Sequence, residues 1–272
     1  MGKNHKSYDE RRGNDVLIVG GELRTGNMLA AGVEQEIDEV SLTQNYILGT
    51  RKILEGAERE FVYVHIRNFG TEIGRGQAAI AYNTAATEKG AGLGALTNGS
   101  NIIPWTVQGA GGILANQFAE GHILCQGGIV LRIKSHPAGA QSAVVNLTCH
   151  ENYHDVTIAA GRSAMLVENK YANVFSRSGG ESAIPGLVVG IPQIYAVKNS
   201  YMWIQVKGPA AVLSSQSDKG AADGEHDIVA NTLAGSECVL RAAHGYQTIG
   251  ILLPMAVDSW DGENFMLVDL KL

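Results

Sequence analysis

Apolar residues come in short runs that are separated by glycine, proline and asparagine along most of the chain. From residue 46 onward the runs recur at spacings of roughly 8 to 12 residues, which is typical of a sandwich or barrel. In 60–67 the aromatic residues alternate with β-branched ones, so both faces of that strand are expected to be covered. The pattern predicts a mainly β fold, with a β-sandwich or barrel-like domain over 46–272.

The remaining strands that we expect share β-branched or aromatic residues between turn signals. They are 122–125, 128–134, 143–148, 155–158, 163–167, 186–189, 193–197, 201–206, 237–241, 248–253 and 264–271. The run 198–200 is predicted as a turn, and Gly208-Pro209 as the end of the strand before it, because proline has no amide hydrogen to donate. Residues 70–112, rich in Gly, Ala, Thr and Asn, are predicted to be mainly loop.

Residues 1–30 have no period that would form a stable helix alone, and we expect an extended N-terminal arm followed by an acidic link over 1–45. Apolar residues in the arm are expected to add a strand to a neighbouring molecule or to another copy. The expected contact residues are Val16, Leu17, Ile18, Val19, Met28 and Leu29.

Charge is sparse in this chain of 272 residues. It has 21 Lys and Arg against 27 Asp and Glu, a net charge of −6, and only 18% charged residues. An acidic chain without a basic block argues against nucleic-acid binding, and no apolar run reaches the ~20 residues of a membrane helix. No secretory signal is recognised, and Cys125, Cys149 and Cys238 are expected to be reduced thiols of a cytosol-made protein. Sparse charge also suggests that neighbours cover part of the surface.

The strongest motif is His150-Glu151-Asn152-Tyr153-His154, which matches H-E-x-x-H. On a helix this spacing holds Zn²⁺ between the two imidazoles, with the glutamate as general base. Here the motif lies between two predicted strands, where five polar residues form a loop more readily than a helix. A zinc hydrolase using His150, Glu151 and His154 is therefore the less favoured alternative, and no catalytic residue, cofactor or metal is expected.

Other candidate sites are also weak. The glycine pattern 21–26 lacks the Lys and Ser/Thr of a phosphate-binding loop. Adjacent residues Cys149 and His150 on a strand end point to opposite sides, so a thiol–imidazole pair is not expected. The three tryptophans are interpreted as core or interface anchors. A carbohydrate-binding sandwich is an alternative that requires Trp105 or Trp260 to be exposed.

Several blocks occur in an order that resembles the decoration (cement) proteins of tailed bacteriophages. The blocks are Tyr46-Ile-Leu-Gly-Thr-Arg51, Glu60-Phe-Val-Tyr63, Ala115-Asn-Gln-Phe-Ala-Glu-Gly121, Ile129-Val-Leu-Arg-Ile-Lys-Ser-His136, Val167-Glu-Asn-Lys-Tyr-Ala-Asn-Val174, Val188-Val-Gly190 and Tyr201-Met-Trp-Ile-Gln-Val-Lys-Gly-Pro209. The last two match in order and spacing a pattern of the form vvG…yyWvQ-x-xGp. The acidic segment 34–39 and the tail 258–272 lie outside the match.

The resemblance implies a non-enzymatic structural protein on the exterior of the phage capsid, made in the host cytoplasm. Its implied partners are the major capsid protein and further copies of itself, as a homotrimer or, alternatively, a dimer; neither nucleic acid nor membrane is implied. A tail or head-fibre component that contacts the host surface is the alternative, with loops 70–112 and 214–227 as its tips.

Overall fold

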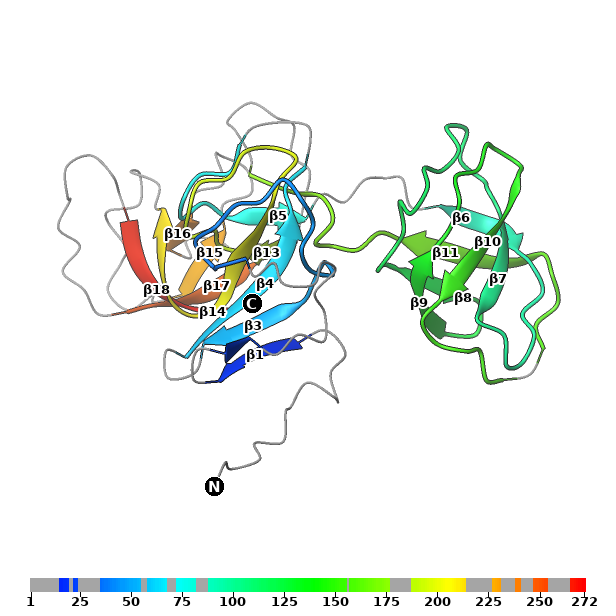
Figure 1. Cartoon of the computed structure of the whole chain (residues 1–272), viewed down its shortest axis with the longest axis horizontal. Helices are drawn as coiled ribbons and strands as arrows, with labels where there is room; N and C mark the ends of the chain where they lie inside the picture. The colour runs from blue at the N-terminus through cyan, green and yellow to red at the C-terminus, as the bar shows by residue number, and fades with distance from the viewer. Residues whose placement is uncertain are drawn as a thin grey trace, which may run out of the picture. The chain divides into compact units, whose positions relative to one another are not determined.

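The computed structural model describes residues 15–19, 22–23, 35–54, 58–67, 72–81, 88–155, 157–176, 187–213, 227–230, 238–240, 247–253 and 265–272. Within these ranges every regular element is a strand, and none is a helix (Figure 1). The predicted mainly β fold is confirmed. None of the described segments is a helix long and apolar enough to cross a membrane.

The β-rich region is divided into two compact units, although the sequence predicted one domain over 46–272. The first unit comprises Met1–Asn83 and Tyr171–Leu272, and the second comprises Thr84–Lys170. The chain enters the second unit inside the stretch 70–112, which was predicted to be mainly loop, and leaves it between two predicted strands, 163–167 and 186–189. Neither crossing has the Pro-rich, Gly/Ser-rich or charged composition that identifies a linker, so the strand pattern alone did not reveal the boundary.

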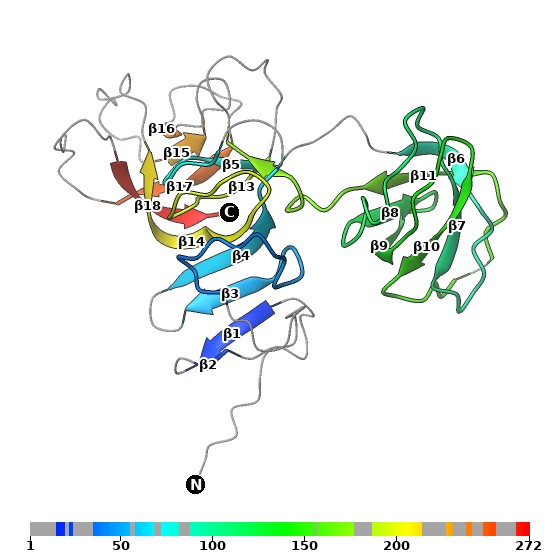
Figure 2. The ribbon, with the colours of Figure 1, turned by 45° about the horizontal axis from the view of Figure 1, so that its top comes forward.

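The first unit contains a nine-stranded sheet of order β16-β15-β17-β18-β14-β4-β3-β1-β2 (Figures 1 and 2). Its strands are β1 (Asp15–Val19), β2 (Glu22–Leu23), β3 (Arg51–Leu54), β4 (Arg59–His65), β14 (Tyr201–Leu213), β15 (Asp227–Ala230), β16 (Cys238–Leu240), β17 (Thr248–Leu252) and β18 (Phe265–Lys271). Four consecutive residues of β4, from Phe61 to Val64, are buried, as the apolar composition of both its faces predicted.

Strand β14 continues through Gly208 and Pro209, so the prediction that this pair ends the strand was wrong. The register with β4 shifts between Gln205 and Lys207, Lys207 pairs with both Glu60 of β4 and Lys271 of β18, and from Gly208 onward the described pairing of β14 is with β18. Gly208 has φ +80, and a Cβ there would lie 2.3 Å from the Glu58 carbonyl oxygen. The bulge therefore lets the strand pass a proline while it changes partner.

The first unit also contains a three-stranded sheet of order β12-β5-β13. Its strands are β5 (Ala79–Ala81), β12 (Val174–Phe175) and β13 (Val188–Gly190). Buried side chains of these strands pack with those of the larger sheet, because Ile80, Phe175 and Val188 share one apolar cluster with Val212 and Val268.

The second unit is a closed barrel of order β10-β7-β6-β11-β8-β9 (Figure 2). Its strands are β6 (Lys89–Leu93), β7 (Ile102–Thr106), β8 (His122–Cys125), β9 (Ile129–Ser135), β10 (Val144–Cys149) and β11 (Arg162–Val167). Side chains alternate between interior and exterior; in β8, Ile123 and Cys125 are buried while His122 and Leu124 are exposed. The interior holds its own apolar core, centred on Trp105, Phe118 and Leu147.

Strands β6 and β7 lie in the stretch 70–112, which the sequence predicted to be mainly loop. The glycines of β6 caused this error, because glycine is usually depleted from strands. In the barrel a Cβ at Gly92 would lie 2.4 Å from the Thr106 carbonyl oxygen, so the close approach of β7 requires glycine there. Two other predicted strands, 155–158 and 193–197, form only isolated bridges at Ile158 and Ala196.

The predicted arm is described only at β1 and β2. Strand β1 pairs in parallel with β3, from Asp15 opposite Arg51 to Ile18 opposite Leu54, and antiparallel with the short β2. Val16, Leu17, Ile18 and Val19 thus belong to the second strand from the end of the chain's own sheet, between β3 and β2. Met28 and Leu29 lie outside the described residues, and their predicted role stays a prediction.

Candidate functional site

The H-E-x-x-H motif lies in a loop that follows β10, as its sequence context predicted. His150, Glu151 and His154 are exposed, whereas Tyr153 between them is 2% exposed. The backbone over this motif is not helical, so the two imidazoles do not share the helical face that binds zinc. Among the described residues no group of three or more His, Cys, Asp or Glu side chains could hold a metal ion.

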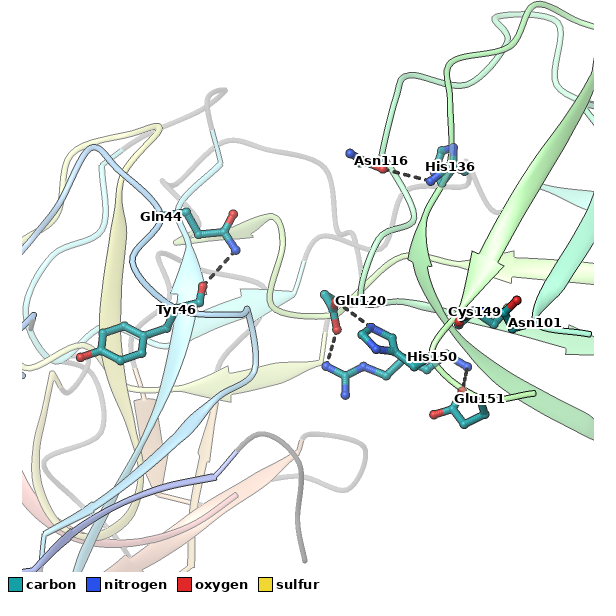
Figure 3. A network of polar contacts seen from close by, with 10 residues as sticks. Gln44, Tyr46, Asn101, Asn116, Glu120, His136, Cys149, His150 and Glu151 are labelled. Atoms are coloured by element: carbon teal, nitrogen blue, oxygen red, sulfur yellow. Dashed lines mark hydrogen bonds and ion pairs between the residues drawn. The ribbon is translucent and has the colours of Figure 1, made fainter. Parts of the chain in front are cut away.

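His150 belongs to a different polar group, which is centred on Glu120. Its Nε2 lies 2.9 Å from Glu120 Oε1 (Figure 3). The other carboxylate oxygen of Glu120 forms an ion pair with Arg132 of β9. The Arg132 backbone amide donates to Glu151 Oε2 at 3.0 Å. These contacts join the loop before β8 to β9 and to the loop after β10. Sequence reasoning missed Glu120 and Arg132, because 30 residues separate Glu120 from His150 and no spacing connects them.

A second histidine of the barrel, His136, is 4% exposed and has a structural role. Its Nε2 accepts the Phe118 amide at 3.0 Å, and its Nδ1 lies 2.9 Å from the Pro137 carbonyl oxygen. These partners require a neutral ring with the proton on Nδ1. Burial lowers the pKa of His136 from its ordinary value, which favours the same neutral form.

Cys125 and Cys149 are buried thiols. Burial raises the pKa of Cys125 to about 11 and that of Cys149 to about 12, the latter with a further contribution from Glu151. A thiol with such a pKa stays protonated at neutral pH and is a poor nucleophile. Cys149 is buried and its neighbour His150 is exposed, in line with the expectation that adjacent residues point to opposite sides.

In the first unit, blocks that lie far apart in the sequence meet in one buried aromatic cluster, formed by Tyr46, Tyr63 and Trp203. The ring centroid of Tyr46 lies 5.2 Å from that of Tyr63 and 5.0 Å from that of Trp203, and 5.0 Å separates Tyr63 from Trp203. Such edge-to-face and tilted pairs stabilise a core beyond their burial. Trp203 is 1% exposed and, in the barrel, Trp105 is 0% exposed, so both are core residues as predicted. Trp260 lies outside the described residues.

Gln35 anchors the acidic link on this aromatic cluster. Its side-chain oxygen accepts hydrogen bonds from Tyr63 Oη at 2.7 Å and from Asn45 Nδ2 at 3.1 Å. Its backbone oxygen accepts from Trp203 Nε1 at 3.0 Å and from Lys52 Nζ at 3.3 Å. Gln35 is fully buried, although the sequence predicted only an acidic link here. Nothing in the local sequence distinguishes this glutamine from its acidic neighbours.

The barrel exposes an apolar row on its outer surface. Leu124 of β8 lies directly opposite Val130 of β9 and, on its other side, opposite Met165 of β11. Leu124 is 39% exposed, Val130 is 55% exposed, and Met165 is half-buried. The outward residues of a solvated antiparallel sheet are usually polar, so three apolar neighbours on adjacent strands identify this apolar row as a candidate interaction surface.

The apolar row could not be recognised in the sequence. The runs 122–125 and 128–134 were predicted as strands, but the alternation does not say which of their apolar residues fill a core and which face outward. Comparison with known proteins adds nothing to this assignment, because the chain matches no protein-family model, no curated protein and no solved structure.

Proposed function

We propose that the chain is a phage capsid decoration (cement) protein, which binds the outer surface of the head and stabilises the mature shell. The observation that carries the proposal is the ordered set of blocks that resembles this family, above all 188–190 followed by 201–209. Ile191, which directly follows the first block, pairs with Gln205 of the second, and their backbone groups exchange hydrogen bonds of 2.8 and 2.9 Å.

The physical character of the chain agrees with a structural role. Tyr46, Tyr63 and Trp203, from three of the resembling blocks, occupy the same buried cluster, so these blocks supply the residues that hold the first unit together. Few charges and an outward apolar row suit close packing against neighbours, since apolar burial contributes about 25 cal/mol per Å². Repetition over a symmetric shell multiplies weak contacts through avidity. The major capsid protein is the proposed partner.

Immunogold labelling of intact virions of the phage that encodes the chain tests this function. Label over the head is expected, with the protein present in the denatured particle at a stoichiometry comparable to that of the shell subunit. Label confined to the tail would instead favour the component that contacts the host. Absence of the protein from the particle would overturn the virion assignment.

The arm supplies a second test of head binding. Strand β1 pairs with β3 on one side, while on the other side the described strand β2 pairs only with Ile18 and Val19. An extended segment with such a partly covered side is suited to pairing with another chain. Removal of residues 1–30 is expected to reduce occupancy on heads that lack the protein, while far-UV circular dichroism stays that of a folded β protein. Removal of residues 1–14, which leaves β1 in place, is the matched control. Equal occupancy for both truncations would contradict a role of β1 in attachment.

A further inference from the structure

The apolar row of Leu124, Val130 and Met165 lies among basic side chains of the barrel. Lys89 of β6 is directly opposite Met165, and Lys134 lies four residues after Val130 on the same outward face of β9, with Arg132 between them. Both lysines are exposed, and neither forms an ion pair with another described residue. The row and these two lysines are called the barrel face below.

Acidic side chains of the barrel are engaged within it. Glu88 accepts the amides of Gln108 and Gly109, each at 2.7 Å, and Glu120 is paired with Arg132 and His150. The carboxylates of Glu151 and Glu168 accept hydrogen bonds within the barrel. Thr84–Lys170 contains five acids and five bases, so the whole net charge of −6 belongs to the first unit. The barrel face therefore presents apolar surface with free positive charge.

Residues 36–42 of the first unit present negative charge beside an exposed apolar side chain, whereas the barrel face presents positive charge. Glu36, Asp38 and Glu39 are exposed in this segment, and the Glu36 side chain is 65% exposed although it lies 3.9 Å from Lys52. Leu42 follows at 76% exposure, the highest of the exposed large hydrophobic residues described. Gln35 anchors the start of the segment on the aromatic cluster, and Ser41 pairs with Tyr201. The acids and Leu42 are thus displayed on a fixed backbone.

We propose that the barrel face of one copy of this chain binds residues 36–42 of a second copy. Leu42 would cover the apolar row, while Lys89 and Lys134 face Asp38 and its acidic neighbours. Buried apolar contact supplies affinity, and the opposite charges set orientation and exclude pairing of like surfaces. The two surfaces differ, so the contact is head-to-tail and generates a closed ring where the rotation between copies closes. This contact joins copies of the chain without a shell, so its test is independent of the virion labelling.

Sedimentation velocity of the purified full chain over a concentration series tests the proposal, with Leu124→Asp as the first variant. The wild-type chain is expected to self-associate, and Leu124→Asp to raise the dissociation constant about tenfold or more. Val144→Asp is the matched control, because Val144 is 67% exposed on β10 of the same barrel and lies outside the barrel face. It is expected to associate like the wild-type chain. Far-UV circular dichroism and thermal denaturation establish that each variant is folded.

Charge reversal tests the pairing of the two surfaces. It tests the proposal even if Leu124→Asp does not fold. Lys134→Glu and Asp38→Lys are each expected to weaken association, whereas the double variant restores it, because every head-to-tail contact then regains an opposite pair. Lys198→Glu, an exposed lysine of the first unit outside both surfaces, is the charge-matched control. A monomeric wild-type chain, equal effects of Leu124→Asp and Val144→Asp, or a double variant no better than the single variants would overturn the proposal.

Discussion

At the scale of single residues, His136 makes the barrel sensitive to acid. The neutral ring accepts the Phe118 amide, and burial keeps its folded-state pKa below the ordinary value of 6.5. The unfolded chain therefore binds a proton first as the pH falls. The contribution of neutral His136 to the free energy of unfolding is complete above about pH 6.5. It is lost progressively as the pH decreases toward the folded-state pKa.

The free energy of unfolding is expected to fall by up to about 1.4 kcal/mol per pH unit on acidification below pH 6.5, through His136 alone. His136→Gln, which keeps an acceptor and a donor but does not titrate, should reduce this slope in urea denaturation at pH 7 and pH 5. His154→Gln is the control, because His154 is exposed and forms no hydrogen bond with another described residue. Equal slopes for the wild-type chain and His136→Gln would contradict this role.

Gln205 shows how one buried side chain supports the β14 bulge. Its Nε2 donates to the carbonyl oxygens of Lys207, Gly208 and Pro209 at 2.9–3.1 Å, and its Oε1 accepts from the Arg59 guanidinium at 2.7 Å. Gln205→Leu leaves these groups without their partner in a fully buried site. A loss of about 2–4 kcal/mol is expected in chemical denaturation.

Gln193→Leu serves as the matched control for the Gln205 variant, because the Gln193 amide forms one long hydrogen bond of 3.4 Å, to the Ile191 carbonyl oxygen. This substitution is expected to cost less than about 1 kcal/mol. Similar losses in the free energy of unfolding for the two variants would show that Gln205 does not stabilise the bulge.

At the scale of strands, β6 depends on a glycine that the sequence pattern could not explain. Gly92→Val would place side-chain atoms against the Thr106 carbonyl oxygen and is expected to destabilise the barrel by about 2 kcal/mol or more. At Gly111 an added Cβ meets nothing within 4 Å, and Gly111→Val should change stability by less than about 0.5 kcal/mol. Thermal denaturation of the two variants beside the wild-type chain decides this; similar midpoints for both would contradict the packing argument.

Strands with regular alternation could be predicted from the sequence, whereas those shaped by a neighbouring backbone could not. His122–Cys125 was predicted with its observed bounds because its alternation is local information. Glycines of β6 and Pro209 of β14 depend on close approach by β7 and on a bulge, which are tertiary facts. The apolar row of the barrel could not be predicted from the sequence for the same reason. The loop conformation of the H-E-x-x-H motif followed from its flanking runs, but the outward direction of Leu124 depends on barrel closure.

At the scale of the whole molecule, the two units have separate apolar cores. All members of the barrel core belong to Thr84–Lys170, whereas the other three clusters contain only residues of the first unit. Cooperative unfolding follows shared core packing. A chain with two cores is therefore expected to unfold in two transitions rather than in one.

Differential scanning calorimetry of the full chain can assign these transitions with the variants already argued. Gly92→Val should lower the midpoint of one transition by several degrees, roughly 4–8 °C per kcal/mol for a unit of the barrel's size, and leave the other in place. Gln205→Leu should shift the second transition and leave the first, because its broken hydrogen bonds lie wholly within the first unit. If both variants shifted a single transition together, the cores would be coupled into one cooperative domain, as the sequence alone had suggested.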